Sequence, residues 1–330
     1  MSFFKRLWPA VATVGLLLSL FTAPQTALAQ VRVGVSDWPG WVAWYIAEQK
    51  GFFKKHGANV RLVWFANYTD SISALSAGQL DANSQTWSDT MSPLAKGLPL
   101  KVILVNDNSA GNDALMVGPS IKSFRDLQGK TIALEEYSVS HFLLSMALNR
   151  HGLKPKDVRI VNLSAGDAAA AFLAGRVDAA VVWNPWINTI QSSGRGRALF
   201  TSADVPGMIP DLLVAQEKAL AAKRKDFVGM VKAWFDVVAF IRSNPDEAAR
   251  IMAKVVQMEP KEYQVFLAGT KFFGAEENLQ AFGSASDPAS LLGAAPTIAK
   301  FLLDNKLMEG RADFAKAVDG SLVREALGRR

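Results

Sequence analysis

ALSAGQLDA at residues 74–82 and AFLAGRVDA at residues 171–179 are two copies of one sequence pattern. Similar apolar segments precede them, VRLV at 60–63 and VRIV at 158–161, so the pattern recurs after 97 or 98 residues. Each copy is typical of a strand, a loop, a helix that ends at a left-handed glycine, and a second short strand. One repeat of this length predicts two lobes of similar build, because solenoid repeats are much shorter. We interpret the aspartate of each copy as structural.

Apolar runs elsewhere extend this interpretation to the whole chain. Short runs typical of buried strands alternate with helical segments, and the sequence after residue 216 is mostly helical. This order of elements predicts an α/β fold. The further strands are expected near 31–35, 100–105, 114–117, 130–134, 179–183 and 212–215.

The chain is expected to cross between the lobes twice, near residues 107–113 and near residues 211–215. We therefore expect residues 30–110 and 214–330 to form lobe 1 with C-terminal helices, and residues 111–213 to form lobe 2. Two extended crossing segments make a hinge that can close around a ligand. The ligand cleft is expected between the lobes, beyond the carboxyl ends of the strands.

Residues 1–29 have the three-part pattern of a secretory signal peptide. Lys5 and Arg6 precede the apolar run at 11–21, and small residues stand before Gln30. Eleven apolar residues are too few for a membrane span, which needs about 20. We expect cleavage after Ala29 and a periplasmic protein that does not itself span the membrane.

Composition excludes several classes of protein. The chain has 330 residues, of which half are hydrophobic and a fifth are charged, so it is long and apolar enough to fold around a core. It has no cysteine, which excludes a disulfide framework, an iron–sulfur cluster and a thiol nucleophile. The three histidines are scattered, and no nucleophilic triad or phosphate-binding loop is evident. We expect no metal, no cofactor and no enzyme activity.

Charge gives no indication of a nucleic-acid partner. The first 29 residues hold two basic and no acidic residues, so the remaining chain has 34 basic and 30 acidic residues. This excess is small, and the short basic runs at 223–225 and 329–330 are typical of solvated helix surfaces.

The loops that follow the predicted strands hold the candidate ligand-binding residues. Five of the nine tryptophans fall there together with several acids, whereas lysine and arginine are absent from these loops. Carboxylates and indole faces suit a small cation or a neutral amide, whereas an anion needs basic side chains or helix N-termini. The candidates are Asp37, Trp38, Trp41, Trp87, Asp89, Glu135, Ser138, Trp183, Asn184 and Asp211.

Several of these assignments have alternatives. Glu135 and Glu136 are adjacent and are expected to point in opposite directions, and we expect Glu135 in the cleft. Asp37 fits the role of a helix cap as well as that of a ligand contact. Ser138 starts a predicted helix whose N-terminus could hold an anion, although two glutamates come directly before it.

Longer motifs resemble those of a known family. KGFFKKHGANV at 50–60, AGQLDA at 77–82, DLQGK at 126–130 and GRVDAAVVWNPW at 175–186 resemble periplasmic solute-binding proteins of the nitrate/sulfonate/taurine group. The resemblance covers nearly all of the chain after the signal peptide. It implies a class II periplasmic-binding-protein fold and delivery of a small molecule to the transmembrane permease subunits of an ABC importer. We expect the protein to be a monomer.

The resemblance also bears on the ligand. SDWPGW at 36–41 and WNPW at 183–186 are similar to the branch encoded beside urea-carboxylase-type enzymes, which implies a guanidinium- or urea-like nitrogen compound. The alternative is taurine, another aliphatic sulfonate or a nitrate-type anion, because those binding proteins share the scaffold. Thiamine-pyrimidine synthases are also similar, but their cysteine-rich iron motif cannot exist in a chain without cysteine.

Overall fold

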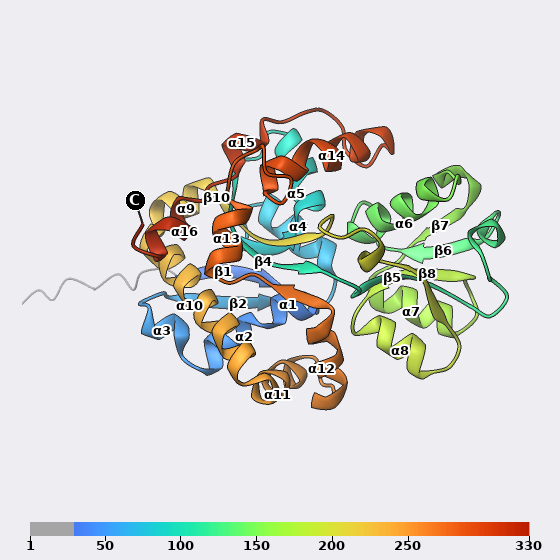
Figure 1. Ribbon diagram of the computed structural model, residues 1–330, viewed down its shortest axis with the longest axis horizontal. Helices are drawn as coiled ribbons and strands as arrows, with labels where there is room; N and C mark the ends of the chain where they lie inside the picture. The colour runs from blue at the N-terminus through green and yellow to red at the C-terminus, as the bar shows by residue number, and fades with distance from the viewer. Residues whose placement is uncertain (1–29, 330) are drawn as a thin grey trace, which may run out of the picture.

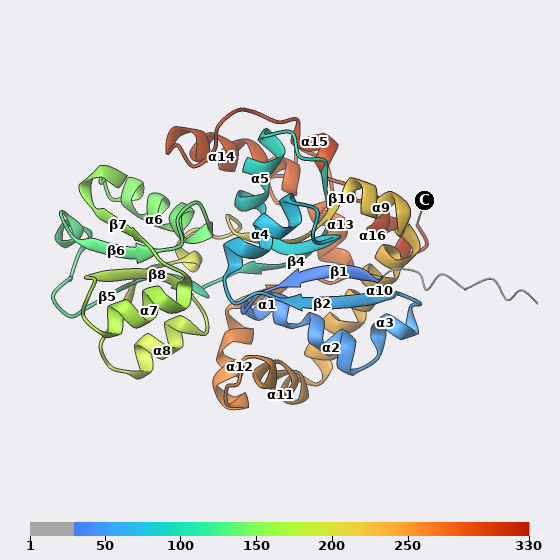
Figure 2. The same cartoon turned by 180° about the vertical axis from the view of Figure 1, so that it is seen from behind.

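The computed structural model describes residues 30–329, which form two α/β lobes side by side (Figures 1 and 2). The expected signal peptide and its cleavage point lie outside the described residues. The larger sheet has the order β11 (Thr270–Phe272), β4 (Leu100–Ser109), β10 (Pro210–Gln216), β3 (Ala82–Thr86), β1 (Val31–Val35) and β2 (Val60–Trp64). The smaller sheet has the order β7 (Arg159–Asn162), β6 (Thr131–Leu134), β8 (Ala179–Trp183), β5 (Asp113–Val117) and β9 (Arg197–Thr201).

Both sheets combine parallel and antiparallel pairs in the same way. In the larger sheet β1 lies parallel to β2 and β3, whereas β10 lies antiparallel to β3 and β4. In the smaller sheet β6 lies parallel to β7 and β8, whereas β5 lies antiparallel to β8 and β9. The shared pattern confirms the α/β fold class and the two similar halves that the internal repeat predicts.

The helices cover both faces of these sheets, as expected for strands that are apolar on both sides. Around the larger sheet lie α1 (Pro39–Val42), α2 (Trp44–Gln49), α3 (Phe52–Lys55), α4 (Tyr68–Ser76), α5 (Trp87–Ala95), α9 (Glu217–Ala222), α10 (Arg224–Ser243), α11 (Pro245–Val255), α12 (Pro260–Ala268), α13 (Ala275–Ala281), α14 (Leu291–Asp304), α15 (Phe314–Ala317) and α16 (Ser321–Ala326). The smaller sheet is flanked by α6 (Val139–Arg150), α7 (Ala165–Leu173) and α8 (Trp186–Ser192). Within residues 30–329 no helix combines the length and the apolar character that crossing a membrane requires.

The repeated aspartate has the same structural role in each lobe. Asp81 accepts a hydrogen bond from the Arg32 amide at 2.8 Å and returns its own amide to the Arg32 carbonyl at 2.9 Å. Asp178 does the same with Thr131, at 2.9 Å in both directions. The glycines that end the two preceding helices are left-handed, with φ of 72° and 69°. These bonds tie the start of the central parallel strand to the chain that enters the next strand, which confirms the interpretation of both aspartates as structural.

The chain passes from the larger sheet to the smaller one after β4 and returns at β10. The return strand begins at Pro210, a few residues earlier than the boundary expected at 213/214. The two crossing segments lie beside each other, because the Ser109 amide donates to the Ile209 carbonyl at 3.1 Å. A third connection comes from α14, whose Phe301 packs edge-on against Phe142 of α6 at 5.3 Å between ring centroids.

The first turn of α1 lies directly against β4, which requires a glycine. A β-carbon at Gly40 would lie 1.8 Å from Oδ2 of Asp107, closer than any real contact. We predict that Gly40→Ala lowers the free energy of unfolding by about 1–3 kcal/mol, because the buried carboxyl or the helix must shift. Urea unfolding would measure the loss.

Gly118→Ala is the matched control for this substitution. A β-carbon there meets no heavy atom within 4 Å, and its backbone is not left-handed. We expect its effect to stay within about 0.5 kcal/mol. Equal stability of the two variants would show that α1 does not depend on this close approach.

Candidate ligand-binding site

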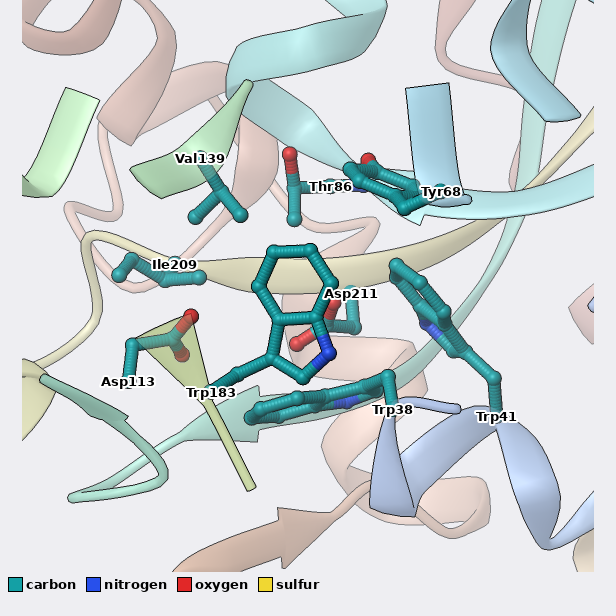
Figure 3. Close-up of a pocket in the computed structure, with 9 residues that line it drawn as sticks. All are labelled: Trp38, Trp41, Tyr68, Thr86, Asp113, Val139, Trp183, Ile209 and Asp211. Carbon is teal, nitrogen blue, oxygen red and sulfur yellow. The ribbon is translucent and has the colours of Figure 1, made fainter. Parts of the chain in front are cut away.

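A small cavity lies between the lobes, where the ends of several strands meet (Figure 3). Its volume is only about 10 Å³, which is room for about one water molecule. A larger solute would therefore require the lining side chains or the two lobes to move apart. The residues that line the cavity are Trp38, Trp41, Tyr68, Thr86, Asp113, Val139, Trp183, Ile209 and Asp211.

Four aromatic rings form most of the wall. Trp38 and Trp41 come from the start of α1, with ring centroids 6.3 Å apart, and Trp41 lies 5.0 Å from Tyr68. Trp183, the last residue of β8, reaches across from the smaller lobe and meets Tyr68 edge-on at 5.9 Å. Figure 3 shows its indole in the middle of the group, so both lobes contribute to one aromatic enclosure.

Three buried aspartates lie on the hinge side of this enclosure. Asp211 of β10 is directly opposite Asp107 of β4 in the strand register, and Asp113 opens β5. Burial raises the pKa of Asp107 and of Asp113 to about 7. Burial, together with the charges of Asp107 and Asp113, raises the pKa of Asp211 still further. Two carboxyls this close in a dry site do not both ionise, so we place the retained proton on Asp211.

Two buried carboxyl oxygens have no hydrogen-bond partner within residues 30–329, namely Oδ2 of Asp113 and Oε2 of Glu135. The retained proton joins the carboxyl groups of Asp107 and Asp211 in a hydrogen bond. Asp107 also accepts from the Trp38 indole at 3.0 Å. Buried acceptors without donors cost free energy, so a solute that supplies N–H groups would be stabilised here.

A carboxylate–indole clasp connects the two lobes. The two oxygens of Asp37, which follows β1, accept from the indole nitrogens of Trp183 and Trp186, both at 2.8 Å. The residue is partly exposed, but its carboxylate is enclosed, and burial raises its pKa to about 6. The clasp means that Asp37 serves lobe closure in this structure and does not cap α1, whose N-cap Trp38 has no side-chain hydrogen bond.

Two further carboxylates make contacts between the lobes. Asp89 accepts from the Val139 amide of α6 at 3.0 Å, and Glu135 accepts from the Thr69 hydroxyl at 3.2 Å. Burial raises the pKa of Asp89 to about 6 and that of Glu135 to about 7. Glu135 is 3% exposed, whereas its neighbour Glu136 is half-buried and borders an outer groove. The two glutamates diverge as their adjacency predicts.

The structure brings most of the predicted residues together. Trp38, Trp41, Trp183 and Asp211 line the cavity. Asp37, Asp89 and Glu135 lie around it, where each accepts a hydrogen bond from the opposite lobe. None of the nine lining residues is a lysine or an arginine, which matches the absence of basic residues from the predicted loops.

Three predicted residues are not brought to the cavity, because local hydrogen bonds engage their side chains elsewhere. Trp87 points into the larger lobe, where its indole donates to the Leu291 carbonyl at 3.3 Å. Asn184 donates to Oδ1 of Asn112 at 2.8 Å and accepts from the Asn188 amide, so it braces the start of α8. Ser138 caps α6 by accepting from the Ser140 amide at 3.1 Å.

Five of the residues that line the cavity are not among the candidates predicted from the sequence. Asp113 lies in the expected first crossing and could have been found by examining every acid there. Tyr68 and Thr86 lie at the start of α4 and the end of β3, positions that carry the polar signal used for the other loops. Val139 and Ile209 are apolar, and nothing in their chemistry separates them from core residues.

Residues 30–329 contain no cluster of histidine, aspartate and glutamate side chains that could hold a metal ion.

Comparison with known proteins places the chain in a family. The NMT1/THI5-like family matches residues 38–248, which include all nine lining residues. The chain belongs to this family.

Several relatives are named as binding proteins. A protein of Brucella abortus (strain 2308) named as a binding protein is 29% identical over 294 residues, covering 86% of this chain and 90% of the relative. The taurine-binding periplasmic protein of Escherichia coli (strain K12) is 32% identical over 144 residues, covering 44% of this chain and 45% of that protein. The alkanesulfonate-binding protein SsuA from Xanthomonas axonopodis pv. citri has a similar structure, with a TM-score of 0.75 and 20% identity, covering 89% of this chain and 99% of the other. The last likeness confirms the periplasmic-binding-protein fold.

The clasp predicts a measurable role in lobe closure. Trp186→Phe keeps the ring but removes one of the two indole donors to Asp37, and Trp186 does not line the cavity. We expect the free energy of unfolding to fall by about 1.5–3 kcal/mol, since hydrogen bonds to charged groups are of that size. Small-angle scattering of the ligand-free protein should show a larger radius of gyration. Trp64→Phe, at a partly exposed ring, is the control and should change neither quantity.

The raised carboxyl pKa values predict an unusual dependence of stability on pH. Between the ordinary value near 4 and the folded values of about 6–7, the folded state holds more protons than the unfolded state. The free energy of unfolding therefore falls as pH rises through this window, by about 1.4 kcal/mol per group and pKa unit. We expect the ligand-free protein to melt at a higher temperature at pH 5 than at pH 8.

Substitution of two of these carboxyls tests the assignment. Asp113→Asn with Glu135→Gln should flatten the pH profile, because the neutral amides no longer titrate. Asp167→Asn, at an exposed carboxylate on α7, should leave the profile unchanged. A wild-type protein that is least stable at pH 5 would contradict the prediction.

Proposed function

We propose that this chain is the periplasmic solute-binding protein of an ABC importer. Its lobes close on a small molecule, and the closed form docks on the transmembrane permease subunits. Membership of the family, the two-lobed fold with a cavity between the lobes, and the names of the relatives support this proposal. The described site offers binding groups, and the proposal assigns it no catalytic step.

For the ligand we propose a compact molecule rich in N–H donors, such as guanidinium or urea. The observation that carries this proposal is the unpaired carboxyl oxygen of Asp113, with the carboxyl group of Asp211 beside it, in a cavity whose lining holds no lysine or arginine. A cation would pair with the carboxylates, and the indole faces would add about 0.5–2 kcal/mol of cation–π attraction. A neutral amide would satisfy the same acceptors by hydrogen bonding.

The second candidate is taurine, another aliphatic sulfonate or a nitrate-type anion. The names of the relatives favour this class over the first, since two of them bind taurine or an alkanesulfonate. Within this chain the supporting observation is the Trp41 indole nitrogen, a buried donor without a partner among the described residues. One indole donor is a weak counterpart for an anion that would also lie beside several carboxyl groups.

The size of the ligand limits its affinity. Guanidinium has four heavy atoms, and at a ceiling of about 1.5 kcal/mol per atom its binding free energy is roughly 6 kcal/mol. This corresponds to a dissociation constant on the order of tens of micromolar. A titration must therefore use protein concentrations of at least that order.

Calorimetric titration of the protein from residue 30 onward separates the two candidates. Guanidinium, urea, taurine and nitrate would be added one at a time at pH 8. We expect heat from guanidinium or urea and none from the two anions. Heat from taurine or nitrate, with no heat from guanidinium or urea, would establish the second candidate and overturn the first.

A further inference from the structure

We propose that Asp89 is a specificity-determining residue, a built-in anion that occupies the N-terminus of α6 in place of an anionic ligand. The inference rests on the proposed function and deepens it, because it names the group that rejects anions. It concerns one carboxylate that the larger lobe extends to the smaller one.

The geometry around Asp89 is that of a bound anion. Its Oδ2 accepts from the Val139 amide at 3.0 Å and from the Tyr68 hydroxyl at 2.8 Å, while Oδ1 accepts from the Ser88 hydroxyl at 3.1 Å. The side chain is 7% exposed. Three donors from two lobes therefore surround a carboxylate that belongs to the protein itself.

The contact between Asp89 and Val139 bears on anion binding because of where Val139 lies. Val139 is the first residue of the twelve-residue helix α6, and it also lines the cavity. The first amides of a helix have no partner within the helix, and the helix dipole attracts negative charge there. The next amide, of Ser140, is already taken by the Ser138 cap. An incoming sulfonate or nitrate would thus meet an occupied helix terminus.

Other acids reinforce the effect of Asp89. Electrostatic coupling links it to Glu135, Asp113 and Asp211, all of which face it from the smaller lobe or the hinge. On its outer side Asp89 borders a groove that also contains Lys96 and Glu136. In the cavity itself its charge therefore adds to that of other carboxyls, which favours cations.

Substitution of Asp89 tests the proposal directly. Asp89→Ser removes the carboxylate and frees the Val139 amide. At pH 8 we therefore expect this variant to bind taurine at least about tenfold more tightly than the wild type does. Guanidinium should bind about tenfold more weakly. Asp89→Asn removes the charge but keeps the shape, and should reproduce the loss of guanidinium affinity with a smaller gain for taurine.

Asp167→Asn is the matched control. Asp167 stands at the third position of α7 after a serine cap, as Asp89 stands at the third position of α5 after a threonine cap. Unlike Asp89, it is exposed, and its hydrogen bonds are with Ser164 of its own lobe. It should change neither affinity. Melting curves of each variant confirm that it is folded before titration.

Acidification of the wild-type protein gives a test without substitution. Protonation of the carboxyls around the cavity should allow taurine to bind at pH 5, since a sulfonate stays ionised, and should weaken guanidinium. Folded Asp89 variants that gain no taurine affinity would overturn the role of Asp89. If the variants do not fold, the same conclusion would follow from a wild-type protein that gains no taurine affinity at pH 5. Guanidinium binding to the wild type would then still support the first ligand candidate, whereas taurine binding to the wild type at pH 8 would overturn both that candidate and the role of Asp89.

Discussion

Burial of carboxyl groups between two lobes, with no basic side chain among the residues that line the cavity, is the constraint on which the arrangement depends. Asp107, Asp113 and Asp211 lie at the hinge, and Asp89 and Glu135 lie where the lobes meet. An uncompensated buried charge is costly, so these groups take up protons or accept whatever donors are near. Indoles, hydroxyls and one backbone amide supply those donors. The carboxyl oxygens without a donor are the groups to which the proposed ligand would bind.

In the proposed binding protein another carboxylate, that of Asp37, would connect ligand binding with closure. Asp37 receives two indoles from the other lobe, and one of them, that of Trp183, is also a wall of the cavity. A solute that rests against Trp183 therefore contacts a residue whose position depends on closure. The clasp lies outside the cavity lining except for this ring, so closure and solute recognition share one side chain. Hinge closure of this kind is the usual response of such two-lobed proteins.

The scaffold beneath the site is built twice from one local device. In each lobe an aspartate after a left-handed glycine bonds back to the first residues of the central parallel strand. This device sets where the next strand starts, and thereby which residues lie at its carboxyl end. The two lobes differ in the segment after that strand, which is α5 with Asp89 in lobe 1 and residues 183–186 with their two indoles in lobe 2. The same strand arrangement in the two lobes thus positions different residues, which together form the candidate site.

The sequence by itself determined most of the strands, the repeat, the α/β class and the acidic and aromatic character of the strand-end loops, because these follow from local periodicity and from the order of residues along the chain. It did not predict β9 and β11. It did predict Trp38, Trp41, Trp183 and Asp211, which lie at or near the ends of strands. Tertiary structure alone decided that Trp87 turns into the core, and that Val139 and Ile209 line the cavity. The side on which a loop residue lies depends on contacts with segments far away in the chain, such as Leu291 beside Trp87. No local pattern encodes those contacts.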